Sequence, residues 1–442
     1  MYTLTERSIK EFNYDVIVIG GGPAGCAAAA AAAREGSHTL IVEASGSLGG
    51  MGTIGLVPSW CPFSDEEKVI YKGLAERIFW EAREGIPHLK NKDLLDWVPI
   101  DAEILKRVYD NLMIEFGVDV LFNTMVAAVD TDDNKITAVM AANKNGISAF
   151  KAKIFIDCSG DADLVAWSGG EFLVGDDNGA VQASTHCFTL SNVDEYNFNN
   201  GEILHANNKN CAIHEIIKDE KYTLINDDHI CASFIAPRTI GFNAGHIFDV
   251  SSENMLDFSK ALMLGRKMAN EYRKALSDYV PEVYASSYVS QTAPAFGVRE
   301  SRRIVGDYTL TYKDFLNMAS FEDEIGRNCY FIDVHSSKGA EALENVAVEK
   351  TVYNKGESHG IPYRCLTPKG LKNVLVAGRS ISADKIMQAS IRVMPVCLVT
   401  GEAAGVAAGI AAKKEDINVH NLDVSNIRKI LLKNGGYFFG EE

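Results

Sequence analysis

The glycine-rich run Gly20–Gly25 constrains the fold of this chain more than any other feature. The apolar run Val16–Ile19 precedes it and an alanine-rich segment follows it, an order typical of the first strand, turn and helix of a dinucleotide-binding unit. We expect Gly20 to form the tight turn, Gly22 to let the backbone approach a pyrophosphate, and Gly25 to let the helix pack on the strand. The helix N-terminus, with free N–H groups and partial positive charge, would then bind the phosphates.

An acidic residue follows at the expected distance. The second buried strand, Thr39–Val42, ends at Glu43, near the position of the acid that binds ribose hydroxyls in such units. A second glycine-rich turn, Leu48–Thr53, comes next, where a nicotinamide-binding protein would usually continue into another βαβ unit. This loop lets the chain run close to a longer ligand. The alternative is a flexible loop with no ligand.

The C-terminal part of the chain repeats the theme. Val374–Val376 is a short buried strand that leads into Gly378, and Pro395–Lys413 is a helix rich in small residues that would pack closely. The positive end of its dipole can face a flavin pyrimidine ring and favour the negative charge that develops there on reduction. We therefore predict one FAD site built from both ends of the sequence.

The pattern predicts an α/β fold with a Rossmann-type FAD-binding domain, made of a parallel sheet and a β-meander, plus an inserted α+β substrate domain. The meander is expected over 118–122 and 136–150, and a further parallel strand over Ile154–Ile156, ending at Asp157. Periodicity predicts helices over 66–83, 102–116 and 252–276. The expected domains are 1–175 (FAD, N-terminal part), 176–360 (substrate or cap domain) and 361–442 (FAD, C-terminal part).

Composition and net charge limit the classes of partner that we expect for this chain. Lys and Arg number 43 against 59 Asp and Glu, a formal charge of −16 that argues against nucleic acid but not against an anionic substrate. The first residues lack a signal-peptide pattern, and no apolar run is long enough to span a membrane. The nine cysteines include no CxxC pair, which favours reduced thiols in a cytoplasm and disfavours zinc or a redox dithiol. We expect no metal site.

The sequence resembles the FAD-dependent oxidoreductases of the glutathione-reductase-like superfamily, and within it a bacterial family distantly related to fumarate reductase and succinate dehydrogenase flavoproteins. Ordered blocks carry the resemblance, and only residues 176–286 match poorly. The blocks are Gly20–Gly25 with Glu43, Gly49–Val57, Asp157–Asp163, Arg299–Tyr308, Ile332–His335, and Ile361 through Ala408.

The resemblance implies roles for individual residues. The ADP half would contact the first turn and Glu43, the backbone of Val126 would face adenine, and Asp384, Arg392 and Met394 would line the flavin end. Lys385–Met387 departs from the family pattern, where a His-Glu-Ala-like run is expected, and this weakens a substrate role for that loop. The implied cofactor residues are Gly20, Gly22, Pro23, Ala24, Gly25, Glu43, Ala44, Gly49, Gly50, Met51, Val126, Ser159, Gly160, Asp163, Gly378, Arg379, Asp384, Arg392 and Met394.

Flavin chemistry on carbon requires a proton donor or acceptor and charge control. His335, in a matched block, is the first candidate for proton transfer, and His186 is the second. Arg299, Arg302 and Arg303 are candidates to clamp a carboxylate, stabilise an enolate or hold the flavin pyrophosphate. Their spacing would place Arg299 beside the other two on a helix, although Ile304 and Val305 could equally begin a strand. The alternative is structural: a hydrogen-bonded histidine and an internal arginine network with Glu300 and Asp307.

We therefore expect an enzyme that transfers hydride between flavin N5 and a small polar metabolite, anionic or sugar-like. The alternatives are a flavin-dependent monooxygenase or halogenase, and a flavin-binding redox subunit without its own substrate. The early glycine-rich loop has no histidine, so FAD should bind noncovalently. Expected partners are the small-molecule substrate and either a second copy of the chain or an electron-acceptor protein.

Overall fold

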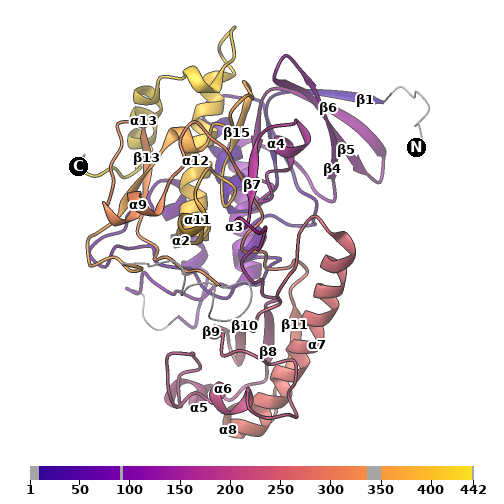
Figure 1. The fold of residues 1–442 in the computed structure, drawn as a ribbon, viewed down its shortest axis with the longest axis vertical. Helices are drawn as coiled ribbons and strands as arrows, with labels where there is room; N and C mark the ends of the chain where they lie inside the picture. The colour runs from indigo at the N-terminus through magenta and orange to yellow at the C-terminus, as the bar shows by residue number, and fades with distance from the viewer. Residues whose placement is uncertain (1–8, 90–92, 336–349, 441–442) are drawn as a thin grey trace.

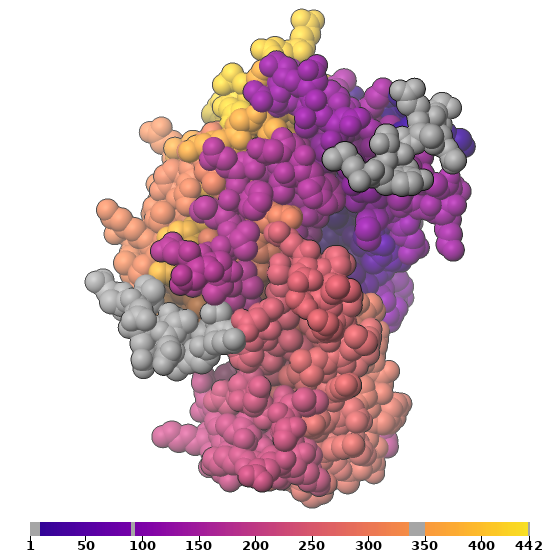
Figure 2. All heavy atoms as spheres, turned by 45° about the vertical axis from the view of Figure 1, so that its right-hand side comes forward, coloured from indigo at the N-terminus to yellow at the C-terminus, as the bar shows by residue number. Residues whose placement is uncertain are grey.

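The chain folds into two lobes of unequal size (Figure 1). The structure, a computed structural model, describes residues 9–89, 93–335 and 350–440. The larger, upper lobe contains both ends of the described chain. The smaller lobe is built from the middle of the sequence and forms the lower end of the molecule in the space-filling view (Figure 2).

A mostly parallel sheet lies at the centre of the upper lobe, in the strand order β3-β2-β1-β6. β15 adds to the same sheet by pairing with the end of β6, where Val374 lies opposite Phe155. The C-terminal strand thus completes a sheet that the N-terminal part begins, as predicted. The parallel strands are β1 (Lys10–Ile19), β2 (Thr39–Val42), β3 (Asp119–Leu121), β6 (Gly146–Asp157) and β15 (Val374–Val376).

The meander extends from the first half of β6. β5 (Lys135–Asn143) pairs antiparallel with β6, and β4 (Met125–Asp132) pairs antiparallel with β5. Two details differ from the sequence expectation. The predicted strand 118–122 is β3, which pairs parallel with β2 and belongs to the main sheet. The strand predicted at Ile154 is the buried end of β6, which passes without a break from the half-exposed meander into the parallel sheet.

Two helices rich in small residues pack against each other beside this sheet. They are α1 (Pro23–Arg34) and α12 (Met394–Ala411), and both are almost entirely buried. A Cβ at Gly401 would lie 2.2 Å from the carbonyl oxygen of Ala24, so only glycine permits this approach. By length and composition α12 could cross a membrane, but 89% of it is buried inside the protein. It serves here as a core helix that joins the two ends of the chain.

Two further helices cover the same lobe. α3 (Ala102–Phe116) begins and ends at the predicted residues, and the Asp101 carboxylate caps it by accepting from the amides of its first turn. α2 (Leu74–Glu84) begins later than the predicted residue 66. The segment before it forms a turn instead, in which the Asp65 carboxylate accepts two backbone amides.

The lower lobe has its own antiparallel sheet and its own hydrophobic core. The sheet has the order β11-β8-β10-β9 and packs with a long helix, α7, which covers the predicted helix 252–276. The elements of this lobe are β8 (Phe188–Ser191), α5 (Glu195–Asn200), α6 (Ile213–Ile216), β9 (Ile230–Ala236), β10 (Thr239–Ala244), α7 (Met255–Tyr279), α8 (Pro281–Tyr284) and β11 (Tyr288–Thr292).

The chain returns to the upper lobe earlier than residue 361, where the sequence analysis placed the boundary. Buried residues of the lower core run from Phe188 to Val298, whereas Leu310, Phe315 and Ile325 belong to the upper core. The remaining upper elements are α4 (Asp163–Trp167), β7 (Phe172–Val174), β12 (Arg302–Ile304), α9 (Tyr312–Leu316), β13 (Glu324–Asn328), β14 (His359–Pro362), α11 (Lys385–Ile391) and α13 (Val424–Lys433), with short 3₁₀ turns at 50–52, 363–365 and 419–421.

Candidate functional site

The first glycine turn has the geometry of a phosphate-binding turn. Gly20 has a φ of +96°, and a Cβ there would lie 2.4 Å from the carbonyl oxygen of Cys158. A Cβ at Gly25 would lie 1.8 Å from the carbonyl oxygen of Gly20, so this turn requires glycine at both positions. A Cβ at Gly22 would meet nothing within 4 Å, so the backbone there borders open space. Pro23 and Ala24 follow in the first turn of α1, whose N-terminus faces this space.

Glu43 lies where the predicted ribose-binding acid should be. It directly follows β2, and its two carboxylate oxygens accept the backbone amides of Gly21, at 2.6 Å, and Ser45, at 2.7 Å. These bonds fix the carboxylate beside the first turn and leave lone pairs for hydroxyl donors. Ala44 next to it is exposed, and Val126 is buried in β4.

The second glycine loop lies directly against the first. The amide of Gly49 donates to the carbonyl oxygen of Gly21 at 2.7 Å. A Cβ at Gly50 would lie 3.0 Å from the Cα of Gly22, and Met51 follows in the 3₁₀ turn at 50–52. Two glycine-rich loops that meet at Gly22 suit an extended dinucleotide, as the sequence predicts.

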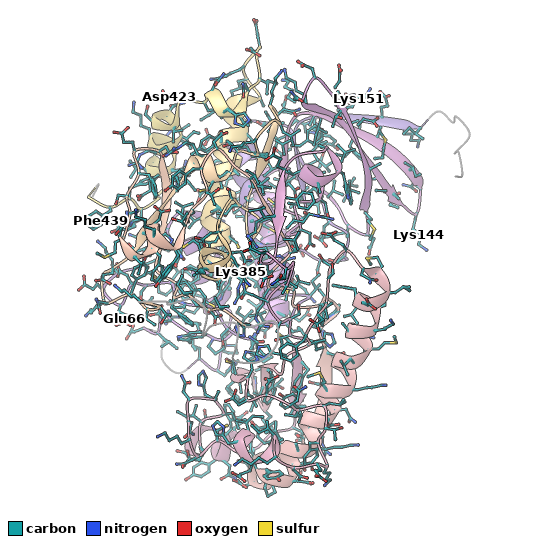
Figure 3. All side chains as sticks on the ribbon, in the orientation of Figure 1. Glu66, Lys144, Lys151, Lys385, Asp423 and Phe439 are labelled. Atoms are coloured by element: carbon teal, nitrogen blue, oxygen red, sulfur yellow. The ribbon has the colours of Figure 1, made fainter. Side chains whose placement is uncertain are left out.

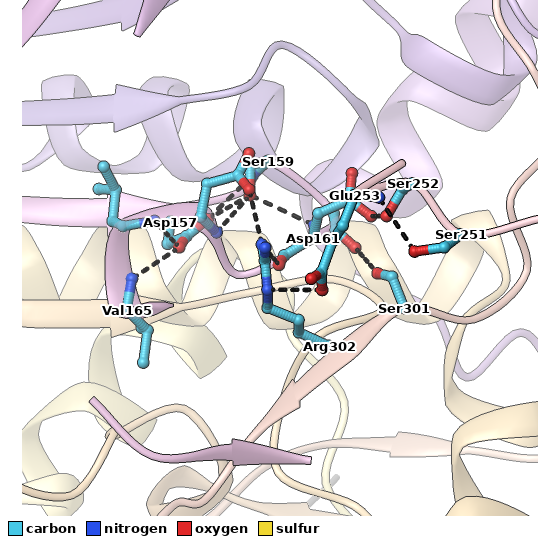
Figure 4. Close-up of polar contacts among 12 residues, drawn as sticks. Asp157, Ser159, Asp161, Val165, Ser251, Ser252, Glu253, Ser301 and Arg302 are labelled. Carbon is cyan, nitrogen blue, oxygen red and sulfur yellow. Dashed lines mark hydrogen bonds and ion pairs between the residues drawn. The ribbon is translucent and has the colours of Figure 1, made fainter. Parts of the chain in front are cut away.

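The loop after β6 is organised by a buried carboxylate that sequence reasoning treated only as a strand end. Asp157 accepts from the amide and hydroxyl of Ser159 and from the amide of Leu164 (Figure 4). Burial raises its pKa. Gly160 has a φ of +81° at the tip, and Ser159 Oγ accepts from the amide of Asp163.

Two arginines bind carbonyl and carboxylate oxygens of this loop. Arg379 donates to the carbonyl oxygen of Gly160 at 2.7 Å and pairs with Asp161 at 3.0 Å. Arg302 pairs with Asp163 at 2.9 Å, and its Nε lies 3.0 Å from the Glu253 carboxylate of the lower lobe, without hydrogen-bond geometry (Figure 4). Burial, followed by the charges of Asp157 and Asp161, nevertheless raises the pKa of Asp163 to about 6.

The predicted cofactor residues of the C-terminal part differ in whether their polar atoms already have partners within the fold. Asp384 caps α11, and its oxygens accept the amides of Met387 and Tyr312, both at 2.7 Å. Both oxygens therefore have backbone partners within the fold. Lys385, in the run that departs from the family pattern, pairs with Asp176 at 3.0 Å near the middle of the molecule (Figure 3). Gly378 has a φ of +89°, and its amide donates to the hydroxyl of Thr400.

Met394 and Arg392 lie at the start of α12. A Cβ at Gly52 would lie 3.0 Å from the sulfur of Met394, so α12 begins against the second glycine loop. Arg392 donates to the backbone carbonyl of Asp333 at 3.0 Å and to its carboxylate at 2.9 Å. Nε of Arg392 is buried and has no hydrogen-bond partner among the described residues.

A cluster of charged and imidazole side chains lies where the two lobes meet. We call it the junction cluster; it consists of Arg299, Asp333, His335 and Arg392, together with His229 and His246 from the lower lobe. The structure brings together two predicted catalytic residues, Arg299 and His335, with predicted cofactor residue Arg392.

Arg299 is 7% exposed, and the hydrogen bonds of one guanidinium nitrogen fix its orientation. Nη1 donates to the carbonyl oxygen of Ala183 and the hydroxyl of Thr185, both at 2.8 Å. Within the described part of the chain, Nη2 makes only contacts of 3.5 Å, to Asn243 Oδ1 and His229 Nε2. Burial and the charge of Arg392 lower the pKa of Arg299 to about 10, so it stays cationic at neutral pH.

His335 contacts a carboxylate on one side and an imidazole on the other. Its Nε2 lies 3.2 Å from Asp333 Oδ2, and its Nδ1 lies 2.8 Å from His246 Nε2. Burial and the charge of Arg299 lower the pKa of His335 to about 3. Burial opposes ionisation of Asp333 too, but the hydrogen bond from His335 and the charge of Arg392 outweigh it and hold the Asp333 pKa well below its ordinary range.

The other two catalytic candidates lie in structural contacts. Arg303, in β12, pairs with Glu300 and donates to the carbonyl oxygens of Gly175 and Ala383, which is the internal network considered as the alternative. Arg302 and Arg303 are in a strand, so the helical spacing of the arginines does not occur. His186 donates from its Nε2 to the carbonyl oxygen of Ala293 at 2.8 Å and packs beneath α7, where its Nδ1 is buried with no partner among the described residues.

Sequence reasoning missed His229 and His246. They flank the hairpin of β9 and β10, in the segment without readable periodicity, and only the fold brings them to His335. Burial holds the pKa of His229 well below its ordinary value, with the charge of Arg299 adding to this. The available signal was five histidines in residues 176–286, a segment otherwise poor in motifs, which is too weak to locate a site.

Comparison with known proteins identifies the family of this chain. The model of a family described as FAD dependent oxidoreductase matches residues 15–431. Over 179 residues the chain is 27% identical to the digeranylgeranylglycerophospholipid reductase of Picrophilus torridus, an alignment that covers 37% of this chain and 44% of that protein. The chain therefore aligns with less than half the length of this curated relative.

Among solved structures, the fold is similar to a geranylgeranyl bacteriochlorophyll reductase-like protein from Thermoplasma acidophilum, with 14% identity, a TM-score of 0.45, and coverage of 96% of this chain and 85% of that one. A flavin-dependent brominase gives 12% identity, a TM-score of 0.45, and coverage of 96% and 83%. The family match spans nearly the whole chain, and the open space over Gly22 between two glycine loops fits the dinucleotide. The chain belongs to the FAD-dependent oxidoreductase family, and its cofactor is FAD.

Proposed function

We propose that this enzyme is a dehydrogenase or reductase that transfers hydride between FAD and a small polar substrate, anionic or sugar-like, bound at the junction cluster. The carrying observation is that this cluster combines a fixed guanidinium, Arg299, with a neutral imidazole, His335. FAD supplies the hydride chemistry when bound. The protein must therefore bind the substrate, orient it and move one proton.

Arg299 and Arg392 are the groups proposed to hold a substrate oxygen. Nη2 of Arg299 has no acceptor closer than 3.5 Å, and Nε of Arg392 is buried without a partner among the described residues. A buried donor without an acceptor costs free energy, on the order of 1–3 kcal/mol, so an oxygen ligand there would recover it. A carboxylate, enolate or hydroxyl oxygen satisfies both donors.

His335 is the proposed proton acceptor. With its Nε2–H donated to Asp333, the lone pair lies on Nδ1, and the low pKa keeps this nitrogen unprotonated at neutral pH. Asp333 would stabilise the imidazolium that forms, and His246 Nε2, 2.8 Å away, would relay the proton.

The remaining predicted roles are part of this proposal. The first turn, Glu43, the second glycine loop and the N-terminus of α12 would line the FAD. Arg303 and Asp384 are assigned positioning roles because their polar atoms have partners within the fold, and His186 is assigned one because its Nε2 is held by the carbonyl oxygen of Ala293. Ser159, Gly160, Asp163 and Arg379 would shape the loop beside the cofactor.

The test is an anaerobic screen of carboxylates, polyols and sugars against the purified yellow protein, followed by bleaching near 450 nm. A substrate of the proposed class should bleach the flavin of the wild-type chain. Arg299→Leu should keep its FAD but bleach at least about a hundredfold more slowly, because one fixed charge contact to the reacting oxygen is lost. Arg238→Leu, on the exposed surface of the lower lobe, is the matched control.

Two outcomes would contradict the proposal. Normal bleaching of the flavin in Arg299→Leu would contradict the assignment of the substrate site to the junction cluster. Reduction of the flavin only through a second protein would favour a redox subunit, and substrate hydroxylation or halogenation with oxygen uptake would favour the oxygenase alternative.

We also propose that the protein acts in the cytoplasm on a free small molecule. All nine cysteines are unpaired thiols, which suits a reducing compartment. Blue-native analysis with and without candidate electron acceptors would test for a second copy or an acceptor protein as partner.

A further inference from the structure

The junction cluster contains three imidazoles that meet from three separate segments of the chain. One ligand nitrogen from each of His229, His246 and His335 can be chosen so that all three lie within 4.8 Å of one another. We propose that these three histidines bind one first-row transition-metal dication, with Zn²⁺ as the probe. The cysteine spacing that argued against zinc does not bear on this site, because it uses nitrogen ligands alone.

Each of two histidines is backed by a carboxylate. Nδ1 of His246 lies 3.3 Å from Asp227 Oδ1, and Nε2 of His335 lies 3.2 Å from Asp333 Oδ2. This is the carboxylate–histidine arrangement that orients metal ligands and raises their basicity. It leaves His246 Nε2 and His335 Nδ1 facing each other at 2.8 Å.

The third histidine supplies a nitrogen without another role. Nδ1 of His229 is buried and has no hydrogen-bond partner among the described residues, and its Nε2 has only the 3.5 Å contact to Arg299. Its ring lies 4.3 Å from that of His246 and 5.0 Å from that of His335, measured between centroids. A buried nitrogen without a partner is costly, and metal binding would satisfy it.

Geometry and charge set how tightly the metal should bind. Tetrahedral zinc with Zn–N bonds of about 2.1 Å needs ligand nitrogens about 3.4 Å apart. Side-chain rotation must therefore move the three nitrogens by roughly an ångström. Asp227 and Asp333 balance the nearby Arg299 and Arg392, so no net negative charge attracts a cation. We therefore expect weaker binding than at a site with carboxylate ligands.

Metal binding has a consequence that rests on the proposed function. His335 Nδ1 is the proposed proton acceptor, and a nitrogen that coordinates zinc cannot take a proton. Zinc occupancy and turnover would therefore exclude each other, and zinc would inhibit the enzyme. The binding itself requires no turnover, so the two proposals fail separately.

The experiment measures zinc binding to tag-free, FAD-loaded protein that has been stripped with a chelator. Competition with a chromophoric zinc chelator gives the affinity, and elemental analysis after gel filtration gives the stoichiometry. We expect one equivalent per chain in the wild type and loss of this equivalent in His246→Ala. Asp227→Asn removes the negative charge beside His246 and keeps an oxygen for the backbone amides of His229 and His246, and it should weaken binding by about ten- to a hundredfold.

His38→Ala, which removes an exposed histidine, is the matched control and should bind one equivalent. Circular dichroism and the flavin spectrum establish that each variant is folded. The proposal is overturned if the wild type retains no zinc, or if both His246→Ala and Asp227→Asn bind zinc as the wild type does. It is also overturned if binding is lost instead in Cys61→Ser, which removes a free thiol close to Asp333 and Arg392.

Discussion

Burial controls the charge state of several side chains at the residue scale, and His359 in β14 is one fully buried case. Its Nδ1 lies 2.8 Å from the Tyr353 hydroxyl, while its Nε2 has no partner among the described residues. Burial, with the charge of Arg327 adding to it, lowers its pKa to about 3. The folded protein therefore keeps this imidazole neutral, at a cost that grows as the solution becomes acidic.

This predicts a specific pH dependence of stability. The unfolded histidine binds a proton below about pH 6.5, but the folded one does so only near pH 3, so the unfolded state binds more protons in this window. Stability should consequently fall as the pH decreases through the window, by up to about 1.4 kcal/mol per pH unit from this group. Urea unfolding of wild type and His359→Asn between pH 4.5 and 7 measures the difference in slope. Parallel curves for the two proteins would show that His359 does not titrate in this way.

At the element scale, the contact between α1 and α12 makes one site from two distant parts of the sequence. The contact requires glycine at positions such as Gly401 and Gly405, where a Cβ would lie 2.2 Å from a carbonyl oxygen of α1. The glycine turn before α1 serves a different purpose, because a Cβ at Gly22 would enter open space. Substitution by alanine should therefore affect mainly stability at the first kind of position and mainly FAD binding at the second.

Gly401→Ala should lower the free energy of unfolding by about 1–3 kcal/mol, because the helices must separate to accept the methyl group. Gly22→Ala should cost about 1 kcal/mol or less in stability, because nothing contacts the added methyl group, yet it should weaken FAD binding by occupying the space over the turn. Chemical denaturation of the apoproteins and FAD titration by fluorescence quenching separate these effects. Unimpaired FAD binding by Gly22→Ala would contradict the assignment of this turn.

Much of the FAD-binding fold was predictable at this scale. Apolar periodicity located α3, whereas the glycine turn with its alanine-rich run located α1 and a proline followed by small residues located α12, since these features act locally. β3 and the start of α2 were misassigned because strand pairing and turn chemistry depend on partners outside the local window. The arginines at 299–303 have helical spacing but lie in a strand and its preceding segment, where pairing with β7 decides the conformation.

At the scale of the whole molecule, the junction cluster could be predicted only in part. His335 and Arg299 belong to blocks with a readable pattern, whereas His229 and His246 come from an insertion whose irregular loops carry no periodicity. Their meeting is a property of how the lower lobe docks, with contacts such as that of Ser252 with Asp161 helping to hold it. The proposed substrate site thus depends on tertiary packing, whereas the glycine turns proposed to hold FAD depend largely on local sequence.

The central claim is that both ends of this chain form one noncovalent FAD site. It is tested most directly by the visible spectrum of the purified protein, measured before and after acid precipitation, with chromatography of the released flavin. We expect flavin absorbance near 450 nm, about one FAD per chain, and complete release into the supernatant. A colourless protein that binds no added FAD, or a yellow colour that stays with the precipitated chain, would contradict it.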